Sequence, residues 1–241
     1  MTKLILIRHG QSEWNEKNQF TGWVDAKLSK KGELEAKLAG ELIKDLNVNI
    51  SNSYTSFLKR ATDTLSIVLR VIGDKNTGVK EAWELNERHY GSLTGLNKSE
   101  TKAKLGEKVL NKYRRSWNLA PPPLEDNSIY LKRFSLLNKK IPTHKIPSTE
   151  SLKDTYNRVI PYYKEHIHPN IIKGKNILVV AHGNSLRALC KYLFNISDTK
   201  INILEIPTGN PLYIKFSSDY AKIIESLYLD KNRKQLLFHN E

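Results

Sequence analysis

Two short apolar runs, each ending in a His-Gly pair, constrain the fold of this chain more than any other feature. Residues 4–7 (LILI) precede Arg8, His9 and Gly10, and residues 177–181 (ILVVA) precede His182 and Gly183. Short runs rich in β-branched residues, with no alternation, are typical of parallel strands buried on both faces. Because ligands bind beyond the carboxyl ends of such strands in open α/β sheets, we expect both imidazoles at that edge.

Strands and helices alternate along the rest of the chain. We expect strands at residues 3–7, 79–83, 177–181, 212–216 and 223–228. We expect helices from Ser29, after residues 54–56, over 98–112, over 151–167, and from Asn184. In the first helix Leu34, Leu38, Leu42 and Leu46 form the apolar stripe, and in the second Leu58, Ala61, Leu65, Val68 and Leu69 form the inner face.

This order predicts an α/β fold: a single three-layer domain with a largely parallel central sheet flanked by helices, plus an irregular cap insertion. We place a catalytic domain at residues 1–229, with the cap insertion at about 98–148. Residues 230–241 form a basic C-terminal tail.

Length and cysteine content narrow the class of protein. A chain of 241 residues can bury a sizeable core. Its single cysteine, Cys190, excludes a disulfide framework and a Cys-rich zinc site. The sequence begins directly with a strand pattern, and no apolar stretch is long enough to span a bilayer. We therefore expect a cytoplasmic protein with no membrane partner.

The chain is strongly basic. It carries 39 Lys and Arg against 25 Asp and Glu, a formal net charge of +14. Residues 98–145 alone hold twelve basic and four acidic side chains. Such a field attracts polyanions or small multiply charged anions, and composition leaves both open. The aromatic residues of this stretch match no nucleic-acid module, so we expect no nucleic-acid partner.

The neighbours of the two histidines favour phosphate over a metal. No His-x-His or HExxH pattern is present, and Arg8, Arg60 and Asn15 are nearby instead of carboxylates, so we expect no metal. Forked guanidinium groups suit phosphate. The chain has no P-loop, no GxGxxG and no aspartate cluster for magnesium. Covalent catalysis by a neutral imidazole remains, with Glu87 as a candidate proton donor.

Several blocks in order carry a family resemblance. They are residues 8–15 (RHGQSEWN), 20–23 (FTGW), 54–61 (YTSFLKRA), 85–91 (LNERHYG), 95–98 (GLNK), 113–115 (YRR), 149–152 (TESL), 181–187 (AHGNSLR) and 206–209 (IPTG). Over residues 3–229 the chain resembles the cofactor-dependent phosphoglycerate mutases of the histidine phosphatase superfamily. RHG alone is typical of the superfamily, whereas NERHYG, LNK and RR are typical of the mutase branch.

The resemblance implies a 2,3-bisphosphoglycerate-dependent isomerase that interconverts 2- and 3-phosphoglycerate in glycolysis and gluconeogenesis. His9 would be the nucleophile, Glu87 the proton shuttle, and His182, Arg8 and Arg60 would stabilise the transferring phosphoryl group. Substrate contacts would come from Asn15, Thr21, Gly22, Arg88, Tyr90, Lys98, Arg114, Arg115, Gly183 and Asn184. The resemblance also implies phosphoglycerates as partners, 2,3-bisphosphoglycerate as the phosphoryl primer without a metal, and a homo-oligomer, dimer or tetramer.

Three segments depart from the family pattern. Residues 124–148 lack its aromatic and acidic cap segment, Asn210 stands where we expect an apolar residue, and the tail after Lys231 is short. Two alternatives remain beside the mutase: a bisphosphoglycerate mutase/phosphatase or broader phosphomonoesterase, and a non-catalytic polyanion-binding protein. Release of inorganic phosphate would identify the first, and salt-sensitive nucleic-acid binding the second.

Overall fold

The central feature is a six-stranded sheet in the order β3-β2-β4-β1-β5-β6. This computed structural model describes residues 1–74, 77–131, 134, 141–219 and 222–233. The strands are β1 (Lys3–Arg8), β2 (Asn52–Thr55), β3 (Gly78–Glu81), β4 (Ile177–Ala181), β5 (Leu212–Phe216) and β6 (Ile223–Tyr228). Strands β1 to β4 are parallel, while β5 runs antiparallel to β1 and β6 antiparallel to β5. The expected largely parallel sheet is confirmed.

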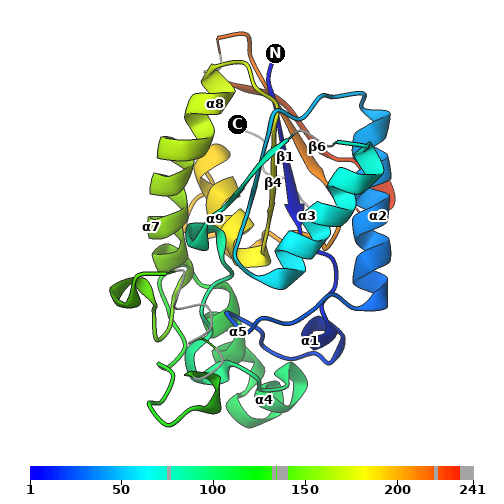
Figure 1. Ribbon diagram of the computed structural model, residues 1–241. Coiled ribbons are helices and arrows are strands. Elements are labelled where there is room, and N and C mark those ends of the chain that lie inside the picture. Colours follow the sequence, from blue (N-terminus) through cyan, green and yellow to red (C-terminus); the bar gives the residue numbers. More distant parts are fainter. Residues whose placement is uncertain (75–76, 132–133, 135–140, 220–221, 234–241) are drawn as a thin grey trace.

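Helices cover both faces of the sheet, which gives the three expected layers (Figure 1). On one face lie α2 (Lys30–Asp45) and α3 (Lys59–Ile72). On the other lie α7 (Leu152–Tyr162), α8 (His168–Ile172) and α9 (Gly183–Leu193). Alternate side chains of the strands enter the two cores: Ile5 and Ile7 pack with α2 and α3, whereas Leu4 and Leu6 pack with α7 and α9. All five side chains of β4 are fully buried, as the unbroken apolar run predicts.

The predicted apolar stripe of α2 is wrong at Leu34 and Leu38, although Leu46 at its end packs against the core formed with α3. Leu34 and Leu38 are 64% and 38% exposed, and the buried face consists of small residues and Ile43. The reason is the close approach of α3: a β-carbon on Gly40 would lie 2.7 Å from Cβ of Val71. At that spacing leucine side chains do not fit between the helices, so small residues form the contact. The inner face predicted for α3 is confirmed, with Ala61, Leu65 and Val68 buried.

Three other expected elements, the helices over 98–112 and 151–167 and the strand over 79–83, differ from the prediction in their continuity or their bounds. The helix predicted over 98–112 is two helices, α4 (Lys98–Leu105) and α5 (Glu107–Arg115), because Gly106 at φ +78° ends the first. Strand β3 stops at Glu81, and a 3₁₀ turn occupies Trp83–Leu85. The helix predicted over 151–167 runs through α7 into a π-helical segment, Tyr163–Ile167. Further 3₁₀ turns are Gly91–Leu93, Thr143–Lys145, Lys200–Ile203 and Lys231–Arg233.

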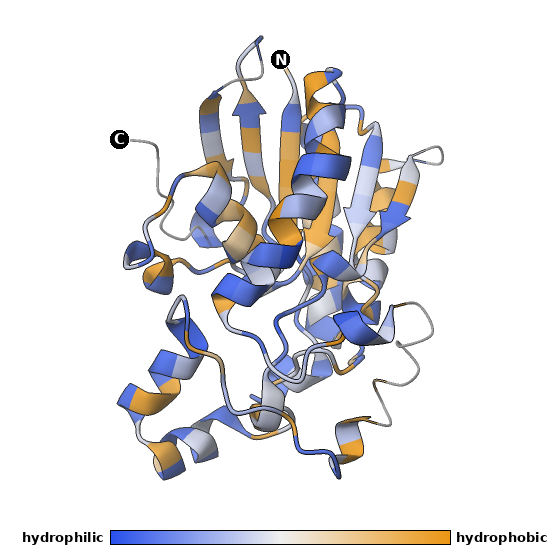
Figure 2. Cartoon of the chain, turned by 90° about the vertical axis from the view of Figure 1, so that its left-hand side faces the viewer, coloured by the Kyte–Doolittle hydropathy of each residue, from blue (hydrophilic) through white to orange (hydrophobic). Residues whose placement is uncertain are grey.

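A less regular layer lies beyond the carboxyl ends of the parallel strands. It contains α1 (Glu13–Glu16), α4 and α5 (Figure 1), and its ribbons carry both hydrophilic and hydrophobic residues (Figure 2). Small apolar clusters hold it together, one around Trp23 and Phe134 and another around Phe20, Leu93 and Leu110. The division into residues 1–229, a cap at about 98–148 and a tail stays a prediction, and residues 234–241 lie outside the described part. Across the described residues, no helix is long and apolar enough to cross a membrane.

Candidate active site

Two histidines lie side by side at the carboxyl edge of the sheet. β1 and β4 are parallel neighbours that pair Arg8 with Ala181, so the next residue of each chain segment is a histidine. The amide of His9 donates to the carbonyl of Ala181 at 2.9 Å, and the ring centroids of His9 and His182 are 4.9 Å apart. Both side chains are buried. The expectation that the two imidazoles share one edge is confirmed.

The hydrogen bonds of His9 fix its tautomer. Nδ1 lies 2.6 Å from the carbonyl oxygen of Gly10, and because a carbonyl only accepts, Nδ1 carries the proton. Nε2 therefore has a free lone pair, which accepts from Nε of Arg60 at 3.2 Å. Burial, and then the charges of Arg60 and Arg8, lower the pKa of His9 well below 6.5. The ring is thus neutral at pH 7, as a nucleophile must be.

His182 is the N-cap residue of α9 and is held from two sides. Its Nε2 lies 2.6 Å from the hydroxyl of Ser56, which follows β2, and its amide donates to the hydroxyl of Ser185 at 3.1 Å. Burial, followed by the charges of Arg60 and His9, lowers the pKa of His182 well below 6.5. The second imidazole is therefore also neutral at pH 7.

Arg60 connects His9 to the loop that carries Thr21 and Gly22. The residue lies in the first turn of α3 and is 1% exposed. Its Nη1 and Nη2 donate to the carbonyls of Val24 and Gly22, each at 2.8 Å, which leaves Nε directed at His9. Burial lowers the pKa of Arg60 to about 10, so the group stays charged at neutral pH.

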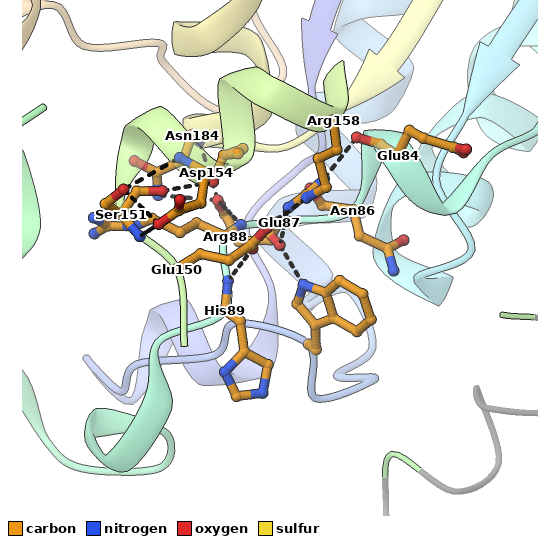
Figure 3. A network of polar contacts seen from close by, with 12 residues as sticks. Glu84, Asn86, Glu87, Arg88, His89, Glu150, Ser151, Asp154, Arg158 and Asn184 are labelled. Atoms are coloured by element: carbon orange, nitrogen blue, oxygen red, sulfur yellow. Dashed lines mark hydrogen bonds and ion pairs between the residues drawn. The ribbon is translucent and has the colours of Figure 1, made fainter. Parts of the chain in front are cut away.

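Glu87 presents one carboxylate oxygen to the protein and the other to the site. Oε1 accepts from the amide of Arg88 at 2.8 Å, and from the amide and side-chain nitrogens of Asn184 at 3.1 and 2.9 Å (Figure 3). Oε2 faces Gly183, where a β-carbon would lie 3.7 Å from Oε2 and 3.5 Å from the guanidinium of Arg8. With Oε1 saturated, Oε2 is the oxygen that can exchange a proton with a ligand.

A cavity of about 250 Å³ joins these groups. The residues expected from the sequence that line it are Arg8, His9, Asn15, Thr21, Gly22, Arg60, Glu87, Tyr90, Lys98, Arg114, Arg115, Gly183 and Asn184. Two expected residues do not line it. His182 is fully buried next to His9. Arg88 is also fully buried: its guanidinium lies 4.7 Å from the ring of Tyr90, and its Nη2 donates to the carbonyl of Arg114 at 3.2 Å.

Sequence reasoning did not select five further lining residues: Gln19, Phe20, Arg187, Glu205 and Ile206. Arg187 lies three residues after Asn184 on α9, and its Nη1 donates to the side-chain oxygen of Asn184 at 2.9 Å. This bond orients the amide so that its nitrogen faces Glu87. The sequence signal that could have identified Arg187 is its i, i+3 spacing from Asn184 on the helix that follows His182.

The walls of the cavity favour a multiply charged anion. Six of its side chains are cationic, and its two carboxylates are Glu87 and Glu205, the latter in an ion pair with Arg115. Burial is the largest cause that lowers the pKa of Lys98 and Arg114, and it lowers the pKa of Arg187 to about 9. A bound anion would favour the charged forms of all three groups.

Metal binding has little basis in this arrangement. Within residues 1–74, 77–131, 134, 141–219 and 222–233, no group of three or more His, Cys, Asp or Glu side chains could hold a metal ion. The cations around His9 would repel one.

Comparisons with known proteins agree on one superfamily. A model of the histidine phosphatase superfamily (branch 1) matches residues 4–145 and 125–226. The chain is 52% identical over 238 residues to a 2,3-bisphosphoglycerate-dependent phosphoglycerate mutase of Pelagibacter ubique (98% of this chain, 99% of that protein). It is 49% identical over 223 residues to a protein of the same name from Borrelia garinii (92% of this chain, 90% of that protein).

Solved structures of lower identity share the fold. A mycobacterial glucosyl-3-phosphoglycerate phosphatase in complex with VO3 matches with a TM-score of 0.71 at 21% identity (95% of this chain, 97% of that chain). A putative alpha-ribazole-5'-P phosphatase of Escherichia coli matches with a TM-score of 0.65 at 22% identity (92% and 94%).

Proposed function

The chain belongs to the histidine phosphatase superfamily, within its phosphoglycerate mutases, and we propose that it interconverts 2- and 3-phosphoglycerate through a phosphohistidine on His9. The observation that supports this most is the neutral, buried His9, whose Nε2 lone pair faces a cavity lined by cations. Such a nitrogen can attack phosphorus, and the surrounding charges favour a substrate with several negative charges.

The residues of the cavity fit 2,3-bisphosphoglycerate, whose dependence the names of the relatives state. Arg8, Arg60, Lys98, Arg114, Arg115 and Arg187 offer cations for two phosphates and a carboxylate. Three buried polar atoms of residues that line the cavity have no partner among the described residues: Nε of Arg8, Nε of Arg187 and Oγ1 of Thr21. When bound, this compound supplies the phosphoryl group that charges His9.

His9 and Glu87 divide the chemistry between them. The Nε2 lone pair of His9 forms the N–P bond as the P–O bond to the leaving oxygen breaks, and Oε2 of Glu87 gives that oxygen its proton. In the return step the substrate hydroxyl passes its proton to Glu87 and attacks phosphorus, and the N–P electron pair returns to Nε2. Glu87 thus alternates between acid and base.

Cations around His9 stabilise the transferring group. Arg60 donates to Nε2 in the resting site, so it must release this nitrogen and turn toward the phosphoryl oxygens. Arg8 adds a second cation, and His182, a neutral imidazole, completes the set around the phosphoryl group. The remaining contacts to substrate are proposed for Asn15, Thr21, Gly22, Arg88, Tyr90, Lys98, Arg114, Arg115, Gly183 and Asn184, with Arg88 acting through Tyr90 and Arg114.

Retention of the bisphosphorylated intermediate separates a mutase from a phosphatase. The intermediate must reorient without leaving, which requires several cationic contacts at once. The cations of α4 and α5 supply them in this proposal. We also propose a role in glycolysis and gluconeogenesis and a cytoplasmic location. The resemblance to the mutases implies a homo-oligomer, dimer or tetramer, which stays part of the proposal.

The experiment compares wild type with His9→Ala after brief incubation with 2,3-bisphosphoglycerate. We expect an acid-labile phosphoryl adduct, found by intact mass, in the wild type alone. Interconversion of 2- and 3-phosphoglycerate and release of inorganic phosphate are measured in the same samples. Phosphate as the main product would indicate a phosphatase, and no adduct together with no turnover would overturn the proposal.

A further inference from the structure

The loop that carries Glu87 is held by a buried ion pair outside the cavity. Arg158 of α7 donates from Nε to Oε1 of Glu150 at 2.6 Å and from Nη2 to Oε2 at 2.9 Å. The two side chains are 7% and 4% exposed. Neither residue lines the cavity, and no role was expected for Arg158 from the sequence. The pair therefore needs an explanation other than contact with substrate.

The other N–H groups of Arg158 donate to backbone carbonyls around Glu87. Nη1 donates to the carbonyls of Glu84 at 2.6 Å and Asn86 at 3.0 Å, and Nη2 donates to the carbonyl of Glu87 at 3.0 Å (Figure 3). With the two bonds to Glu150, all five N–H donors of the guanidinium are used. A lysine has three donors and no fixed fork, so it could not reproduce this set.

Glu150 secures the loop on the other side of Glu87. Its Oε2 accepts from the amide of His89 at 2.7 Å, and its own amide donates to the carbonyl of His89 at 3.0 Å. Trp23 adds a bond from Nε1 to the carbonyl of Glu87 at 2.6 Å. Residues 86–90 form neither helix nor strand, so these bonds take the place of a regular backbone ladder.

We propose that Arg158 and Glu150 are positioning residues that hold the 84–89 loop so that Oε2 of Glu87 faces the cavity. A buried ion pair stabilises a fold little, since the desolvation of two charges offsets their attraction. What this pair provides is the fixed backbone from which Oε2 of Glu87 reaches the substrate hydroxyl. The inference rests on the proposed role of Glu87 as proton shuttle.

Variants are chosen so that the fold survives. Removing one partner leaves an unpaired buried charge, which unfolds many proteins. We therefore use the double variant Arg158→Met with Glu150→Leu, which removes both charges, and the single variant Arg158→Lys, which keeps the charge without the fork. Lys191→Met is the matched control: it breaks the 2.7 Å ion pair with Asp198 on the same core without touching the 84–89 loop.

The leaving group separates positioning from a merely structural role. Turnover of phosphoglycerate needs a proton on the leaving oxygen, whereas 2,4-dinitrophenyl phosphate releases an acidic phenol that needs none. We expect the double variant to lose about 100-fold or more in phosphoglycerate turnover, the range of general acid–base catalysis. Phosphorylation of His9 by the dinitrophenyl ester should change by less than about threefold in the double variant, and likewise in Glu87→Gln. The phosphoglycerate turnover of Arg158→Lys should fall between that of wild type and that of the double variant. Equal losses in phosphoglycerate turnover and in phosphorylation of His9 by the dinitrophenyl ester, or no loss in either, would overturn the inference.

Amide hydrogen exchange tests the loop without any assay of activity. The amide of His89, bound to Oε2 of Glu150, should exchange at least about tenfold faster in the double variant and unchanged in Lys191→Met. Unaltered protection would overturn the inference even if turnover falls. Absence of phosphoglycerate turnover in the wild type would instead count against the proposed function, and the exchange experiment would still test the loop.

Discussion

Nε of Arg60 lies 3.2 Å from Nε2 of His9, so the nitrogen proposed to carry phosphate is already hydrogen bonded to a buried cation. The same guanidinium is the largest charge effect, after burial, that lowers the pKa of His9. Burial and this contact together keep the nucleophile neutral, and the contact places a cation where the phosphoryl oxygens will be. Release of this bond is a required part of the proposed reaction.

The acid limb of the pH profile should lie well below pH 6.5. Protonation of His9 removes the lone pair that attacks phosphorus. Because the pKa of His9 is lowered, the neutral form persists to a lower pH. In Arg60→Gln we expect the limb to move to higher pH, toward 6.5, along with a lower rate. The measurement is the rate of His9 phosphorylation by 2,4-dinitrophenyl phosphate between pH 4.5 and 8, because this donor bypasses Glu87. A wild-type limb at 6.5 would contradict the prediction.

The edge of the sheet could be predicted because it depends on local pattern. Two apolar runs ending in His-Gly require only that their strands be parallel neighbours for His9 and His182 to meet. The face of α2 could not be predicted in this way. Leu34 and Leu38 have helical spacing, yet the approach of α3 at Gly40 leaves room for small residues alone, and that approach is a tertiary property.

Arg158 and Glu150, which hold the loop of Glu87, could not be predicted from the sequence for a different reason. Arg158 and Glu150 are charged residues of an amphipathic region, where a solvated position is the ordinary expectation. Their burial follows from the 84–89 loop, whose backbone groups need partners that no helix or strand supplies. The sequence pattern around Glu150 and Arg158 carries no information about the backbone groups of the 84–89 loop that need these partners.

Stability should fall as the pH drops below 6.5, with His89 as one identifiable cause. Burial lowers the pKa of His89 to about 4 in the folded chain, so below 6.5 the unfolded chain binds more protons. The stabilisation is complete above pH 6.5 and is lost toward pH 4, on the order of 3 kcal/mol from this group. Urea unfolding of wild type and His89→Gln across this range should show a shallower pH dependence in the variant. The difference at pH 8 gives the pH-independent cost of the substitution, and parallel curves would rule out this role.

Asn210 should anchor the beginning of the C-terminal tail. The side chain is fully buried; its Nδ2 donates to the carbonyls of Asp230 and Arg233 at 3.0 and 3.2 Å, and its Oδ1 accepts from the amide of Asp230 at 3.0 Å. Asn210→Val places at this position an apolar residue, the kind of residue expected from the family pattern, and leaves these backbone groups without a partner. We expect a loss of about 1–3 kcal/mol in the free energy of unfolding. The exposed Asn232→Ala serves as the control, and an equal loss there would contradict the assignment.

Glu205 should weaken substrate binding because it occupies Arg115. It is one of two carboxylates in a cavity lined by six cations, and its ion pair with Arg115 must open before that guanidinium can meet a phosphate or carboxylate of the substrate. Glu205→Gln removes both this competition and the repulsion of an anionic ligand. Since the two side chains are 51% and 29% exposed, the gain is modest, and we expect KM to fall by about two- to fivefold with kcat little changed.

Salt dependence makes the test of Glu205 specific. The difference in KM between wild type and Glu205→Gln should shrink as ionic strength rises, because salt screens partly exposed charges. Glu107→Gln is the control, since this residue forms a 3.0 Å ion pair with Lys102 on the outside of the cap and does not line the cavity. A KM that rises in Glu205→Gln would mean that this carboxylate contacts a hydroxyl of the substrate, and Arg115 would then bind the substrate with Glu205 still in place.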